Sequence, residues 1–119
     1  MQPEDARRLR EIVDAGRRVQ AYVGEEGAAV ALKSNQCRSP ILYQLVVHGE
    51  AAAHVSEDTR AALAAVPWRA MKDFQNLLVH RYWSIHDPTL THIVEVEMPP
   101  VLRAIEDHLT TLGDESTSG

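Results

Sequence analysis

Cysteine, aromatic residues, long apolar runs and excess positive charge are all scarce in this chain of 119 residues. The single cysteine, Cys37, cannot form an internal disulfide. No uninterrupted apolar run approaches the roughly 20 residues that a membrane-spanning helix needs. The formal net charge of −5 argues against a broad electrostatic grip on nucleic acid, because phosphate binding requires clustered Lys and Arg. Any contact with such a polyanion must therefore be local.

The composition is that of one ordinary globular domain. Hydrophobic residues make up 45% of the chain and aromatic residues only 5%, while alanine is abundant, a balance that favours packed helices over a sheet. The N-terminal residues lack the apolar core of a signal peptide, so we expect a cytoplasmic protein. We predict one helical domain over residues 1–112 and a disordered polar tail over residues 113–119.

Apolar residues recur every three or four positions in four segments, which predicts an all-α, up-and-down bundle of four main helices. We expect these helices over residues 4–22, 39–65, 67–83 and 89–109, with one or two helical turns near residues 28–32. Ser39-Pro40 and Asp87-Pro88 each place a capping side chain before a proline at the first helical position. Pro99-Pro100 should kink the last helix, because a proline inside a helix removes a backbone hydrogen bond.

The inner face of the second predicted helix changes from bulky to small side chains. Leu45 is followed by Gly49 and Ala52 on this face, which would let a neighbouring helix approach closely at Gly49. His48 and His54 lie six residues apart and do not share a face.

The third predicted helix has a mostly apolar face and a polar face. The first comprises Met71, Phe74, Gln75, Leu78 and Tyr82. Lys72, Asn76 and His80 follow one another at i, i+4 and i+8 and point away from it. We therefore expect His80 outside the core.

Two interpretations of His80 stay open at this point. In the first, it is a solvated side chain near the negative end of the helix dipole. In the second, the positive charges of Arg69, Lys72 and Arg81 surround an imidazole that moves protons near neutral pH, which suits chemistry at a phosphate. Charge alone does not decide between them.

Residues 67–83, PWRAMKDFQNLLVHRYW, resemble the signature of HepT-like ribonuclease toxins of the HEPN superfamily. In that signature a Pro-Trp helix start precedes Arg, four variable residues, His, one variable residue and Tyr. The run GEAA at residues 49–52 is similar to a Gly-Glu-Ala-Ala run of the family, and a family proline matches Pro99 or Pro100. Three landmarks in register, within a resemblance over roughly residues 4–110, make the match fairly specific.

The resemblance implies metal-independent RNA cleavage by attack of a ribose 2′-hydroxyl on the adjacent phosphorus, without a cofactor. His80 matches the family histidine and would move the proton, with Asn76 as a supporting polar group. Lys72 and Arg81 would bind the substrate. The motif arginine is replaced by Gln75, which can hydrogen-bond a phosphate but cannot neutralise it. Whether Gln75 reflects natural decay or an inactivating change stays open.

The resemblance also implies partners. Tyr82 matches the tyrosine that a nucleotidyltransferase antitoxin of the MNT type modifies with AMP, although Tyr82 could instead be a core anchor whose hydroxyl reaches water. Gln75 and His80 lie about 140° apart on a regular helix, so we predict a homodimer that brings a second copy to the same phosphate. The competing hypothesis is a non-catalytic helical dimer that binds the nucleotidyltransferase or a nucleotide. A structural bundle without special chemistry is the third.

Other candidates are weaker. His86 and His92 lie six residues apart without a cysteine pair, so we predict no metal site. Glu50 could contact the third helix, but an exposed carboxylate is the commoner outcome. Trp68 and Trp83 bracket the third helix, where core packing is the first expectation and base stacking the second.

Overall fold

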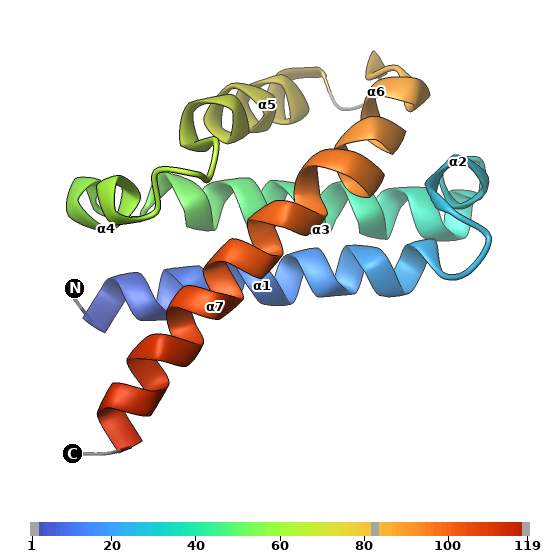
Figure 1. The fold of residues 1–119 in the computed structure, drawn as a ribbon. Helices are drawn as coiled ribbons and strands as arrows, with labels where there is room; N and C mark the ends of the chain where they lie inside the picture. Colours follow the sequence, from blue (N-terminus) through green and yellow to red (C-terminus); the bar gives the residue numbers. More distant parts are fainter. Residues whose placement is uncertain (1–2, 82–83, 118–119) are drawn as a thin grey trace.

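The structure is a computed structural model that describes residues 3–81 and 84–117. This part of the chain is helical without a strand, which confirms the all-α prediction. Figure 1 shows α1 (Pro3–Val23) and α3 (Asn35–Ala53) side by side, with α5 (Trp68–Arg81) on α3 and α7 (Met98–Thr117) crossing α1. Three short helices connect them: α2 (Ala28–Ala31), α4 (Glu57–Ala62) and α6 (Asp87–His92).

The first helix follows its predicted range and buries one apolar face. The residues of that face with the lowest exposure are Leu9, Ile12, Ala15 and Val19. Burying each of the large ones contributes roughly 1.5–3 kcal/mol. Gly16 lies on the same side, and a Cβ on it would meet Leu102 Cδ2 at 2.5 Å. A glycine at this position therefore allows α7 to cross α1 at close range.

The predicted bounds of the second helix are wrong at both ends. It begins earlier, at Asn35, with Ser34 rather than Ser39 at the N-cap, so Pro40 lies inside it and only the carbonyl of Gln36 loses its usual donor. It ends at Ala53 instead of continuing to residue 65. Ser56 takes an extended backbone conformation there, and its hydroxyl accepts a hydrogen bond from the Thr59 N–H at 3.5 Å. This cap starts α4 as a separate helix.

A buried carboxylate joins α1 to the start of α4. Asp5 is only 2% exposed and accepts hydrogen bonds from Ser56 N at 3.0 Å, Ser56 Oγ at 2.6 Å and Thr59 Oγ1 at 2.7 Å. Hydrogen bonding from the Ser56 side chain holds the pKa of Asp5 below its ordinary value, against the opposing effect of burial. The charged form therefore suits this site.

The last predicted helix consists of three joined pieces. Between α6 and α7 the chain forms a π-helix, η2 (Ile93–Glu97), in which the Met98 N–H bonds to the Ile93 carbonyl. The interruption thus precedes the prolines, whose missing N–H groups leave the Glu95 and Val96 carbonyls without their α-helical donors. Residues 113–117, where we predicted a disordered tail, continue α7, and residues 118 and 119 lie outside the described residues.

The π-helix continues a line of buried residues. Leu90, Val94 and Met98 are all nearly inaccessible, lie four residues apart and belong to one core cluster. Glu95 accepts a hydrogen bond from Ala28 N at 3.0 Å and so attaches the π-helix to the start of α2.

Asp87 is not the N-cap of α6, although the sequence predicted it as the capping residue. His86 occupies the N-cap of α6, and Asp87 forms an ion pair with Arg38 from the first part of α3. Arg38 also donates to the Ile85 carbonyl at 3.4 Å. These contacts hold the start of α6 against α3. No helix within the described ranges is long and apolar enough to cross a membrane.

Candidate functional site

The polar face of α5 is exposed, as helix geometry predicts. Lys72, Asn76 and His80 are open to solvent along one side, and Arg81 is exposed at the end of the helix. On the opposite side Leu78 is fully buried, and Met71 and Phe74 are half-buried. His80 therefore stands outside the core, where a phosphate could reach its imidazole.

Gln75 does not share the exposed face of His80. Its side chain is half-buried against α3, where a Cβ on Gly49 would lie 2.8 Å from Gln75 Cβ and 3.0 Å from its Cγ. The predicted close approach at Gly49 is therefore confirmed, and Gln75 is the residue that makes it. Because the stem of Gln75 is held at the α3 interface, this structure does not bring Gln75 and His80 of one chain together.

The remaining predicted residues are less informative. Tyr82 and Trp83 lie outside the described residues. Glu50 is exposed, and the half-buried Trp68 donates from Nε1 to the Leu63 carbonyl at 3.0 Å. Within the described ranges, residues 3–81 and 84–117, no group of three or more His, Cys, Asp or Glu side chains could hold a metal ion.

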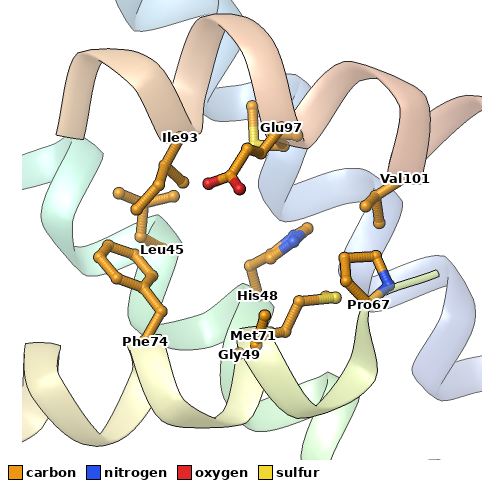
Figure 2. Close-up of a pocket in the computed structure, with 11 residues that line it drawn as sticks. Leu45, His48, Gly49, Pro67, Met71, Phe74, Ile93, Glu97 and Val101 are labelled. Carbon is orange, nitrogen blue, oxygen red and sulfur yellow. The ribbon is translucent and has the colours of Figure 1, made fainter. Parts of the chain in front are cut away.

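Sequence reasoning missed a buried histidine beside a small cavity. The cavity, about 70 Å³, lies between α3, α5 and the η2–α7 segment, with Met71 and Phe74 of α5 in its wall. Figure 2 shows His48 among the side chains that line the cavity, with the Glu97 carboxylate directed into the same space. The three- and four-residue spacings from Leu45 to His48 to Ala52 could have placed His48 on the inner face.

His48 has one fixed ring nitrogen. Its Nδ1 lies 3.0 Å from the Ile12 carbonyl; since a carbonyl can only accept, Nδ1 carries the hydrogen and donates it. Burial lowers the pKa of His48, and the bond to Ile12 opposes this more weakly. His48 therefore ties α3 to α1 through its Nδ1–H, and its burial favours the neutral imidazole. His80 does not line the cavity.

A family model described as "Ribonuclease HepT-like" matches residues 9–108. The chain belongs to this HepT-like ribonuclease family. It is similar to "Putative RNase MJ1380" of Methanocaldococcus jannaschii, with 28% identity over 75 residues, 63% of this chain and 69% of that protein. "Putative RNase MJ0127" of the same organism is 27% identical over 84 residues, 71% of this chain and 69% of that protein. No solved structure matches the chain.

The HepT-like match confirms the family that the α5 signature indicated. Its range includes Gly49, Gln75 and His80. Gln75, where the resemblance leads us to expect the motif arginine, therefore lies inside the matched HepT-like range and packs on α3.

Proposed function

We propose that this HepT-like chain is the ribonuclease component of a toxin–antitoxin pair and that His80 is its proton-transfer group. The observation that carries the proposal is the exposed imidazole of His80 on the free face of α5, in a chain of the ribonuclease HepT-like family. Arg81 and Lys72 place positive charge on the exposed part of the same helix. Such charges attract a phosphate to the imidazole.

The reaction needs only a proton carrier and groups that bind the phosphate. His80 removes the proton from a ribose 2′-hydroxyl, and the resulting oxygen attacks the adjacent phosphorus. The bond from phosphorus to the 5′-oxygen breaks, and the imidazolium returns the proton to that oxygen. The products are a 2′,3′-cyclic phosphate and a 5′-hydroxyl end.

Gln75 makes this copy a weaker catalyst than one with the motif arginine. Its amide can donate a hydrogen bond to the phosphate but adds no positive charge. Removal of a single stabilising donor in other enzymes costs roughly 10²–10³ in rate, or about 3–4 kcal/mol. Lys72 and Arg81 offset part of this loss, and Asn76 supplies a further polar contact one turn before His80.

We propose that the site is completed in a homodimer. Gln75 packs on α3 while His80 faces solvent, which supports a site in which a second copy supplies one of the two groups at each phosphate. A two-fold axis would form two equivalent sites, each with position 75 from one chain and His80 from the other.

The proposed regulator is a nucleotidyltransferase antitoxin of the MNT type. The Tyr82 oxygen would attack the α-phosphorus of ATP and release pyrophosphate, leaving AMP on the tyrosine. The added negative charge two residues from His80 would repel an RNA phosphate and occupy its place. Support for this step is the register of Tyr82 in the HepT-like signature.

The test is RNA cleavage in the presence of a chelator, with analysis of the product ends. The chain would be compared with Gln75→Arg, His80→Ala and the variant that carries both changes. We expect Gln75→Arg to cut roughly 10²–10³ times faster than the parent, with cyclic phosphate ends, and His80→Ala to abolish cleavage in either background. Cleavage that persists without His80 would contradict the assignment.

A second candidate function is a non-catalytic dimer that binds the nucleotidyltransferase or a nucleotide. Gln75 is the observation that favours it, because the charge of the motif arginine is missing. If none of the variants cuts RNA, while the chain still binds its partner, this function replaces the first.

A further inference from the structure

A second surface feature adjoins the proposed catalytic face. Near the start of α5, side chains of α4 and α5 frame an open groove of about 660 Å³. Its charged lining residues are Glu57, Arg60, Arg69, Lys72 and Asp73, and Trp68 lies among them. The groove therefore has three cationic and two anionic side chains in a protein whose formal net charge is −5.

The cations of this groove are not neutralised by contact. The ion pairs within 4 Å that the described residues form involve Arg7, Arg8, Arg17 and Arg38. Arg60, Arg69 and Lys72 are in none of them, although Glu57 and Asp73 line the same groove. Their charge remains available to an incoming anion.

The groove is continuous with the face that carries His80. On α5, Arg69, Lys72 and His80 fall within about 80° of one another, and all three are exposed. The rise of about 1.5 Å per residue separates Arg69 from His80 by about 16 Å along the helix. A stacked strand rises about 3.4 Å per nucleotide along its axis, so this length covers roughly four or five nucleotides of such a strand.

Trp68 adds an aromatic surface whose position is fixed. Its Nε1 donates to the Leu63 carbonyl at 3.0 Å, and the half-buried ring also lines the groove. A fixed aromatic ring between cations is the arrangement on which single-stranded bases stack without strong sequence preference.

We propose that the α4–α5 groove binds single-stranded RNA beside the scissile phosphate, with Arg60 and Arg69 on backbone phosphates. The inference rests on the proposed function in taking RNA as the substrate, and it adds α4 to the binding surface. His80 acts at one end of this path and the groove holds the strand at the other.

The test measures binding separately from cleavage. Anisotropy of a fluorescein-labelled oligouridylate would be recorded in the His80→Ala background, to prevent cleavage, at several salt concentrations. We expect Arg60→Glu and Arg69→Glu each to weaken binding by about tenfold at low salt and to lower the salt slope by about 1 per contact. Arg103→Glu, an equal charge change at an exposed position of α7 outside the groove, should weaken binding less than about twofold.

Several results would overturn the groove assignment. The first is that the protein does not bind oligouridylate. The second is that the groove variants and the Arg103→Glu control bind with equal affinity, whether all of them bind well or all bind weakly. Arg60→Gln and Arg69→Gln provide a milder pair if the reversals disturb folding. If RNA binding depends on the groove but Gln75→Arg does not cut RNA, the proposed catalysis is refuted and the groove assignment stands. If Gln75→Arg cuts RNA and the groove substitutions change neither binding nor cleavage, only the groove assignment is refuted.

Discussion

Gln75 lies directly against Gly49, so the α5 residue that we propose for the phosphate site also lies where α5 approaches α3 closely. A Cβ on Gly49 would be 2.8 Å from Gln75 Cβ, well inside ordinary contact distance. The residue at position 75 therefore has a packing role on α3 as well as its proposed role at a phosphate. Changes at Gly49 and at Gln75 should be interpreted together.

Gly49→Ala should destabilise the fold. Alanine favours a helix by about 1 kcal/mol over glycine, but the new methyl group overlaps the Gln75 stem and forces α5 outward, at a cost of about 1–3 kcal/mol. Urea unfolding would measure the net loss, and Glu50→Ala, at the exposed neighbouring position, is the control. An alanine variant as stable as the parent would contradict the close approach.

The composite site can be tested by complementation between chains. A double variant that carries both Gln75→Arg and His80→Ala has the arginine without the histidine. The parent chain has the histidine without the arginine. Mixed dimers formed by co-expression should cut RNA roughly 50–500 times faster than the parent dimer, because one of their two sites is complete and gains the full factor of about 10²–10³. If both groups act within one chain, the mixture will be no faster than the parent. Sedimentation that finds only monomer at high concentration would also exclude the composite site.

Stability should fall in mild acid because of His48. Burial lowers the pKa of His48 in the folded state below its ordinary value of 6.5. As the pH falls below about 6.5, the unfolded chain takes up a proton before the folded chain does, so the free energy of unfolding drops by up to about 1.4 kcal/mol per pH unit until the folded pKa is reached. Above that range His48 is neutral in both states, and the effect is absent.

The His48 effect can be isolated by a matched pair of variants. Urea unfolding at about pH 8 and about pH 5.5 should show less loss of stability for His48→Gln than for the parent. His54→Gln, at an exposed histidine on the same helix, should keep the parent's pH dependence. Equal pH dependence in all three proteins would show that folding does not lower the pKa of His48.

Asp5→Asn should destabilise the junction of α1 and α4 by about 2–3 kcal/mol near neutral pH, because an amide cannot accept all three hydrogen bonds of the carboxylate. The pKa of Asp5 is lowered from 3.8, so its contribution is complete above that value and is lost as the pH falls through the folded pKa. Chemical unfolding should show the gap between parent and variant closing in acid. Asp14→Asn, at an exposed position of α1, should have little effect at any pH.

Helix geometry predicted the faces of α5 because only one of them carries side chains that suit a core. The same reasoning placed Gly49 at a close approach, since a run of small residues lets a partner helix come near. It could not place the start of α3, because Ser39-Pro40 is a good cap signal and tertiary packing nevertheless extends the helix back to Asn35. The Ser56 cap that divides α3 from α4 depends on Asp5, which is 51 residues away in sequence.

The candidate site was only partly visible in the sequence for a similar reason. Lys72, Asn76 and His80 share a local spacing, which one helix is enough to reveal. Arg60 joins them through the folding of α4 beside α5, and His48 meets its cavity where α3 faces α5 and the η2–α7 segment. Local spacing could indicate that His48 faces inward, but it could not identify the distant segments that surround either residue.

The π-helix at Ile93–Glu97 has a consequence for chain length. A π-turn accommodates about one residue more than an α-turn over the same axial distance. A sequence one residue shorter between His92 and Met98 could therefore form an uninterrupted α-helix while Leu90 and Leu102 keep their places in the core. Conversion to an α-helix with all residues retained would instead turn α7 by about 100° and carry Leu102 away from Gly16. Deletion of a single residue from this segment should therefore destabilise the bundle less than other changes in chain length.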